Sequence, residues 1–223
     1  MVDTTGKSAE EIVSNRLVDH SSWHFFQASS WLDLAKRTQK TSALHYAAFE
    51  LRYGIEYLLF ELLVLATGGL TEREYQKCLG SPGKMKKMLR SEKVLYDRRF
   101  NFTRILMKLD PLSIQLHYWD LDELFCFWGK ASELLHFVGA HSLTYNNIQW
   151  FIKALAQLES IITEIWRNND ETIGVGVIIP EKMDPDVKLA WEAYSKGQLS
   201  DEELSIRMNL ISPILKRRRL TGR

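Results

Sequence analysis

The stretch SALHYAAFELRYGIEYLLFELLVLAT, residues 42–67, decides the fold class. As a helix it is apolar on every side, which is typical of a helix at the centre of a core. Arg52 and Glu56 interrupt it four residues apart, so they share one helical face. An Arg and a Glu are costly in a core unless they pair with each other or with a third polar group. We therefore predict a buried polar cluster at Arg52 and Glu56.

Composition sets the class of protein. The chain has 223 residues, enough for one sizeable core and a small appendage. Its 29 Lys and Arg residues balance 28 Asp and Glu residues, so no overall field favours nucleic acid. Cys78 and Cys126 have no metal-binding spacing and are too few for a disulfide framework, which indicates reduced thiols in the cytoplasm. The polar N-terminus predicts no signal peptide, and the apolar run 55–66 is too short to cross a membrane.

Helical periodicity and capping signals predict an all-α fold. Trp23, Phe26, Trp31 and Leu34 recur near helical spacing before the core helix, and Asp120 caps a strong helix that runs to about residue 137. The predicted organisation is a helical bundle over 8–168, a linker with a short strand over 169–185, a helical hairpin over 186–212 and a basic tail over 213–223. The strand, IGVGVII at 173–179, needs a partner either in this chain or in another subunit. Pro213 is expected to stop the last helix.

A second group of polar residues follows in the helix after Asp120. Glu133 and His136 are three residues apart and share a face, with Lys130 one turn earlier. If this helix packs antiparallel to the core helix, Arg52, Glu56, Glu133 and His136 form one buried cluster. Such a cluster either poises the histidine for acid–base chemistry or simply specifies the packing.

These residues resemble a known family. A long helix such as ELRYGIEYLLFELL, a variable middle, and a helix ending in ASELLHF before a small-residue turn are similar to the HEPN-like helical bundles of bacteria and archaea. The resemblance covers about residues 10–168. It implies a ribonuclease in which an Arg and a His on one helix, completed across a dimer, cleave RNA without metal. Here His136 matches the histidine, and Lys130 stands near the expected Arg.

Lysine lacks the planar fork with which arginine grips a phosphate. The departure therefore favours the other fate of these bundles, a non-catalytic partner-binding subunit in defence or toxin–antitoxin assemblies. A ribonuclease that uses Lys130 with His136, and with Glu133 as a third candidate, stays open as the alternative.

Basic residues gather in the middle of the chain, over residues 84–104. They interleave with Phe100 and Phe102 and are candidates for a nucleic-acid surface, against the commoner interpretation of a solvated face. The candidates are Lys84, Lys86, Lys87, Arg90, Arg98 and Arg99.

The segment AWEAYSKGQLSDEELSIRMNLI resembles a SHOCT-type C-terminal module, which implies an oligomerisation or interaction element. A hairpin this small holds little core alone, so its apolar residues dock on the bundle or on another protein. The partner-binding candidates are Trp191, Tyr194, Leu204 and Met208.

The histidines His20 and His24 stand four apart, but no supporting carboxylate or cysteine accompanies them, so we expect neither a metal nor a cofactor. The sequence thus predicts a cytoplasmic, non-enzymatic subunit of a prokaryotic complex, concerned with defence against phage or plasmid nucleic acid. Its partners are other protein subunits or a second copy of itself. A nucleic-acid-binding adaptor that uses the basic segment is a further alternative.

Overall fold

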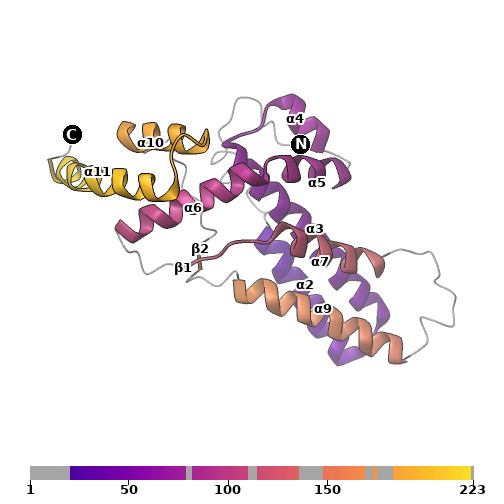
Figure 1. The fold of residues 1–223 in the computed structure, drawn as a ribbon. Helices are drawn as coiled ribbons and strands as arrows, with labels where there is room; N and C mark the ends of the chain where they lie inside the picture. Colours follow the sequence, from indigo (N-terminus) through magenta and orange to yellow (C-terminus); the bar gives the residue numbers. More distant parts are fainter. Residues whose placement is uncertain are drawn as a thin grey trace. The chain divides into compact units, whose positions relative to one another are not determined.

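The computed structural model describes residues 21–78, 82–109, 115–135, 148–168, 173–174 and 183–221. Within these ranges it contains nine helices and one pair of two-residue strands, which confirms the all-α class (Figure 1). The helices are α2 (Ser21–Thr38), α3 (Thr41–Thr67), α4 (Glu72–Cys78), α5 (Pro82–Ser91), α6 (Lys93–Leu109), α7 (Leu121–Glu133), α9 (Ile148–Asn168), α10 (Pro185–Ser195) and α11 (Asp201–Thr221). The first residues of the predicted bundle, 8–20, lie outside the described residues.

The chain divides into two compact units that alternate along the sequence. One unit contains α2, α3 as far as Glu61, α7 and α9. The other contains the end of α3 from Leu62, then α4, α5, α6, both strands, α10 and α11. This division groups the middle of the chain with the C-terminal hairpin; the boundary predicted at residue 168 stays a prediction.

In the first unit, helix α2 buries a different face from the one its aromatic residues predict. Its buried residues are Ser21, Phe25, Ala28, Leu32 and Ala35. Trp23 and Phe26, which we expected on the apolar stripe, are 40% and 55% exposed. The reason is the neighbouring backbone: the Phe25 ring lies against Gly54 of α3, where a Cβ would come within 2.5 Å of it. A glycine at this point lets the two helices approach closely.

Helix α9 packs along α2 (Figure 1). The Trp166 indole Nε1 donates to Ser29 Oγ at 2.8 Å, and Lys36 pairs with Glu159 at 2.7 Å. Helix α7 begins as predicted, because the Asp120 side chain accepts hydrogen bonds from the backbone N–H groups of Asp122 and Glu123. These contacts and caps make the first unit a group of four helices.

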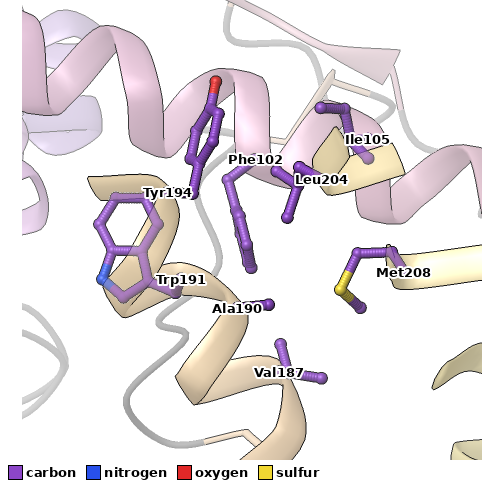
Figure 2. Close-up of a cluster of buried hydrophobic side chains, with 8 residues drawn as sticks. All are labelled: Phe102, Ile105, Val187, Ala190, Trp191, Tyr194, Leu204 and Met208. Carbon is purple, nitrogen blue, oxygen red and sulfur yellow. The ribbon is translucent and has the colours of Figure 1, made fainter. Parts of the chain in front are cut away.

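In the second unit, the hairpin of α10 and α11 packs on α6 (Figure 1). Figure 2 shows the resulting apolar cluster, in which Phe102 and Ile105 of α6 meet side chains from both hairpin helices. Arg98 of α6 donates to the carbonyl oxygens of Tyr194 and Ser195 at 3.2 and 2.6 Å, so it caps the C-terminus of α10. Next to it, Gly197 turns the chain with a φ of 74° and a Cβ position 2.9 Å from the Arg98 guanidinium, where only glycine fits easily.

The predicted strand finds a partner within the chain. Ile173 and Gly174 form strand β2, which pairs in parallel with β1, Gln115–Leu116, and Ile173 lies opposite Gln115. The sequence allowed a partner strand in this chain or in another subunit, and the described residues show one in this chain. The rest of the predicted strand, residues 175–179, lies outside the described residues.

The last helix does not stop at Pro213, contrary to our expectation. Helix α11 runs to Thr221 with Pro213 inside it, so part of the predicted basic tail is helical. A proline removes one intrahelical hydrogen bond, and a long helix can absorb that loss as a bend. The start of α11 is the predicted capping box: Ser200 N donates to Glu203 Oε2 at 2.8 Å, and Glu203 N donates to Ser200 Oγ at 3.2 Å.

In the part of the chain that the structure describes, every helix is too short or too polar to cross a membrane.

The contact between Gly54 and Phe25 gives the first testable prediction. We expect Gly54→Ala to lower the free energy of unfolding by about 1–3 kcal/mol, because the fully buried Phe25 ring must move away from the new methyl group. The matched control is Gly129→Ala in α7, where no atom lies within 4 Å of the added carbon. That change should be neutral or stabilising by up to about 1 kcal/mol, since alanine favours a helix. Urea denaturation measures both, and equal effects would contradict the close approach.

Candidate functional site

The Arg52–Glu56 pair forms, and it is half-buried rather than buried. Arg52 Nε lies 3.1 Å from Glu56 Oε1, and the two side chains keep 30% and 21% of their surface exposed. The third polar group comes from α7: Trp128 Nε1 donates to the same Glu56 oxygen at 2.8 Å. The Arg52 guanidinium also lies 5.5 Å from the centre of the Trp128 ring, within cation–π range. These three side chains tie α3 to α7.

Helix α7 therefore contacts Glu56 at a residue other than the predicted Glu133 and His136. Trp128 takes the place next to Glu56. The side chains of Lys130 and Glu133 are exposed, and His136 lies outside the described residues. Among the described residues, the groups that the HEPN-like resemblance nominates for RNA cleavage are not gathered in a buried site.

The carboxylate that is buried on α3 is Glu61. It is 8% exposed, and Ser21 donates to it twice, from its backbone N at 3.1 Å and from its Oγ at 2.7 Å. Because Ser21 is the first residue of α2, the negative charge lies at the positive end of that helix. The sequence showed Glu61 only as an interruption of an apolar run. The interaction is a structural one, joining the start of α2 to α3.

A set of exposed aromatic side chains lies on α2 and α3 of the same unit. We call it the aromatic face and define it by its large exposed side chains, which are 38–55% exposed: Trp23, Phe26, Tyr46, Phe49 and Tyr53. Within α3 the ring centres of Phe49 and Tyr53 are 4.6 Å apart. Trp31 of α2 stacks on Tyr46 of α3 at 4.8 Å, which connects the two helices. Exposed apolar groups of this size mark interaction surfaces in soluble proteins.

A histidine–carboxylate pair lies beside the aromatic face. His24 Nδ1 is 2.7 Å from Glu50 Oε2, and the imidazole stacks on Tyr57 with ring centres 4.9 Å apart. Tyr53 of the aromatic face is 5.9 Å from the same imidazole. This pair fixes the orientation of His24 and holds the start of α2 against α3.

Sequence reasoning missed the aromatic face because it assigned the whole of α3 to the core. The signal was present: Tyr46, Phe49 and Tyr53 are spaced three and four residues apart, on one side of the helix. The second half of α3, from Leu58 to Val64, is buried as predicted. Only the first half therefore carries a solvent-facing aromatic stripe.

The predicted basic surface divides into two parts. Lys84, Lys87 and Arg90 of α5 are exposed, and Lys86 is half-buried. Arg98 caps α10, and Arg99 is 2% exposed with its guanidinium 4.7 Å from the centre of the Trp191 ring. The two arginines hold the hairpin on α6 and are not displayed to a nucleic acid. Helix α5 is therefore the part of the predicted basic surface that is still exposed, and its ten residues include no acidic side chain.

The four partner-binding candidates of the hairpin are buried inside their own unit. Trp191 and Tyr194 are each 4% exposed, and Leu204 and Met208 are 0% exposed. Their partner is α6, through Phe102 and Ile105 (Figure 2). Of the two docking sites that the sequence left open, the bundle and another protein, the structure shows packing within the chain, because the hairpin needs these residues to complete a core that it shares with the rest of its unit.

No group of three or more histidine, cysteine and acidic side chains is arranged to hold a metal ion within the described ranges. Of the two histidines considered as a metal pair, His24 pairs with Glu50, and His20 lies outside the described residues. Cys78 is half-buried and Cys126 exposed, and both are free thiols. Burial raises the pKa of the Cys78 thiol, which disfavours its reactive thiolate form.

Comparisons of the chain with protein-family models, with curated proteins and with solved structures find no match.

The shared Glu56 oxygen gives a second prediction. Arg52→Ala should lower the free energy of unfolding by about 0.5–1 kcal/mol, because Glu56 is partly solvated and keeps the Trp128 hydrogen bond. Glu56→Ala should cost more, about 1–2 kcal/mol, since the Trp128 indole N–H and Arg52 both lose their acceptor. Trp128→Phe, which removes that donor and keeps a ring, is the control, and urea denaturation is the measurement. A larger loss for Arg52→Ala than for Glu56→Ala would show that Glu56 behaves as a buried charge.

Proposed function

We propose that the protein is a non-catalytic interaction subunit that binds another protein through its aromatic face. The observation that carries the proposal is the exposure of Trp23, Phe26, Tyr46, Phe49 and Tyr53 on two adjoining helices. Aromatic side chains are enriched at protein interfaces, where they bury large areas with few rotatable bonds. A surface of this kind costs solubility unless a partner covers it.

The polar residues next to these aromatics favour a protein partner over a lipid surface. Gln27 and Ser30 of α2 and Glu50 of α3 lie between the exposed rings along the two helices. They are uncharged or acidic, and the cation between Phe49 and Tyr53, Arg52, is paired with Glu56. Helices that bind anionic membranes instead place several Lys and Arg residues beside their apolar residues. Glu50 is moreover engaged with His24.

The finer assignment is a HEPN-like bundle within a prokaryotic complex that acts against phage or plasmid nucleic acid. Its support is the order of the helices: α2 with α3, and α7 with α9, form one unit, and the segment between them belongs to the other. That arrangement fits two helix pairs separated by a variable middle. A cytoplasmic location and a SHOCT-type role for the hairpin belong to the same proposal and rest on the sequence alone.

The aromatic face supplies the third prediction. In the cells that make the protein, the tagged wild type should co-purify with a partner in a fixed ratio. The double change Phe26→Ser, Phe49→Ser should abolish recovery of that partner, because the two rings are 55% and 44% exposed and support no core. The matched control is Ile148→Ser, Ile152→Ser on α9, where both side chains are 51% exposed. Quantitative mass spectrometry of the purified material compares the three proteins.

Two outcomes would contradict the proposal. Recovery of the same partner by the Phe26→Ser, Phe49→Ser protein would exclude the aromatic face. RNA cleavage by the pure chain, abolished by His136→Ala or Lys130→Ala, would replace the non-catalytic role with the ribonuclease alternative.

Helix α5 supports a second candidate function, a nucleic-acid-binding adaptor. Its exposed Lys84, Lys87 and Arg90 recur every three residues, and no carboxylate on the helix offsets them. Spacing of this kind places the three cations along one side of the helix, where they can contact successive phosphates.

The fourth prediction follows from these cations. If α5 binds nucleic acid, Lys84→Gln, Lys87→Gln should weaken binding to an RNA oligonucleotide and reduce the slope of log K against log salt by about 1–2. Arg98→Gln is unsuitable as a control because it uncaps α10, so the exposed Lys153→Gln, Lys188→Gln pair is used instead. Fluorescence anisotropy across a salt series gives the slopes. Binding that is absent, or independent of salt, would remove this function.

A further inference from the structure

Helix α2 carries a second row of side chains beside the row that packs into its unit. The inner row is buried and consists of Ser21, Phe25, Ala28, Leu32 and Ala35. The second row is half-buried and consists of His24, Gln27, Trp31 and Leu34. Its members are three and four residues apart and the pattern repeats after seven residues, which is the spacing of helices that pack along each other. Helix α2 therefore has the periodicity of a helix with packing partners on two sides.

Helix α3 carries a matching row, and the two rows meet. The ring centres of Trp31 and Tyr46 are 4.8 Å apart, and the imidazole of His24 contacts both Glu50 and Tyr57. We call the two rows together the seam. The row on α3 has steps of four, three and four residues and consists of Tyr46, Glu50, Tyr53 and Tyr57.

The seam runs through the aromatic face, since Tyr46 and Tyr53 belong to both. The other helices of the unit make their contacts at different residues: α9 meets Ser29 of α2, and α7 meets Glu56 of α3. A helix that docks on a protein surface uses anchor residues at positions i, i+3, i+4 and i+7. Two facing rows with this same spacing therefore fit a further helix that lies along them.

The seam contains one carboxylate, Glu50, and only one of its oxygen atoms has a partner. Glu50 Oε2 lies 2.7 Å from His24 Nδ1, whereas no residue that the structure describes donates a hydrogen bond to Oε1. The side chain is 21% exposed, so water can reach it in the free chain. An occupant of the seam removes that water and must supply a donor in its place, because a desolvated carboxylate without a donor is costly. The nearby Arg52 is engaged with Glu56, so the donor comes from the occupant.

We propose that the partner of the aromatic face is an amphipathic helix of another protein, which lies along the seam and places one Lys or Arg against Glu50. The inference rests on the proposed function and specifies its partner. A cation satisfies the free oxygen of Glu50, and apolar residues three and four positions away cover the rings on either side. Acyl chains could cover the same rings, but they offer no donor to the carboxylate. A polar position within an apolar seam also fixes the register of the docked helix.

Photo-cross-linking in the cells that make the protein identifies the occupant. The full chain carries p-benzoylphenylalanine in place of Ser30, an exposed residue of α2 beside the seam. After irradiation, mass spectrometry should find the Ser30→p-benzoylphenylalanine chain joined to a peptide of another protein, whose apolar residues recur every three and four positions around a Lys or Arg. The matched control is Ile152→p-benzoylphenylalanine on α9, where the native side chain is 51% exposed. It should not give that product.

A double-mutant cycle tests the contact with Glu50. The cross-linked segment is made as a synthetic peptide, and isothermal titration calorimetry measures its binding to the full chain. Glu50→Gln should weaken binding by about 10- to 100-fold. Replacement of the peptide's cation by Gln should cause a similar loss, and the two changes together should cause little further loss.

Two variants separate a direct contact from a structural effect. Glu56→Gln is the matched control, because Glu56 is also 21% exposed but contacts α7, and it should leave peptide binding unchanged. His24→Gln removes the histidine that orients Glu50 and keeps the carboxylate, so it should weaken binding less than Glu50→Gln does. Circular dichroism checks that all three variants keep their helices.

Five results would overturn the proposal. They are no cross-linked product at Ser30, a product formed only with this chain or a second copy of it, a cross-linked segment without helical spacing, a Glu50→Gln chain that binds like the wild type, and an equal loss with Glu56→Gln. The proposed function has its own test, because it fails when the Phe26→Ser, Phe49→Ser protein still recovers the partner. If that double change abolishes recovery and Glu50→Gln has no effect, only the helix with its cation is excluded.

Discussion

The arrangement of the first unit depends on how closely α2 can approach α3, and Gly54 sets that distance. With no Cβ in the way, the flat ring of Phe25 lies directly on the α3 backbone. This contact selects which side of α2 faces inward, and the small residues Ala28 and Ala35 complete that side. Because a helix has one inward side, Trp23 and Phe26 must then face outward. The exposure of these two aromatic residues is thus a consequence of the packing of a glycine, although hydropathy alone would place them in a core.

The sequence is sufficient to find helices but not to orient them. Periodicity and caps locate α3 and the start of α7 closely, since apolar spacing and capping side chains are local properties. The orientation of α2 depends on Gly54, which is 29 residues away from Phe25 and invisible to a local pattern. In the same way, Arg98 and Arg99 look like neighbours in a basic run, although one caps a helix and the other lies under an indole ring. Their roles are set by residues about 90 positions later in the chain.

The polar residues of the core show a related limit. Arg52 and Glu56 attract notice because they are charged within an apolar run, and the structure pairs them. Their third partner is the indole of Trp128. Tryptophan combines a large apolar ring with a single N–H donor, so a pattern that classes it only as apolar misses its hydrogen bond. Glu61 is the more buried carboxylate, and its partner Ser21 gives no signal of its own.

The order in which the chain is synthesised has a consequence for the second unit. Its core joins Phe102 and Ile105 of α6 to side chains of α10 and α11, the farthest of which is Met208. At a translation rate of about 5–20 residues per second, about 5–20 s pass between the synthesis of α6 and the synthesis of Met208. The apolar side of α6 and the buried Arg99 have no native cover in that interval, whereas the first unit already has all its helices once α9 is complete. The nascent chain is therefore most exposed to aggregation and to chaperones late in synthesis, and a ribosome that stops before α11 releases a product whose core lacks Leu204 and Met208.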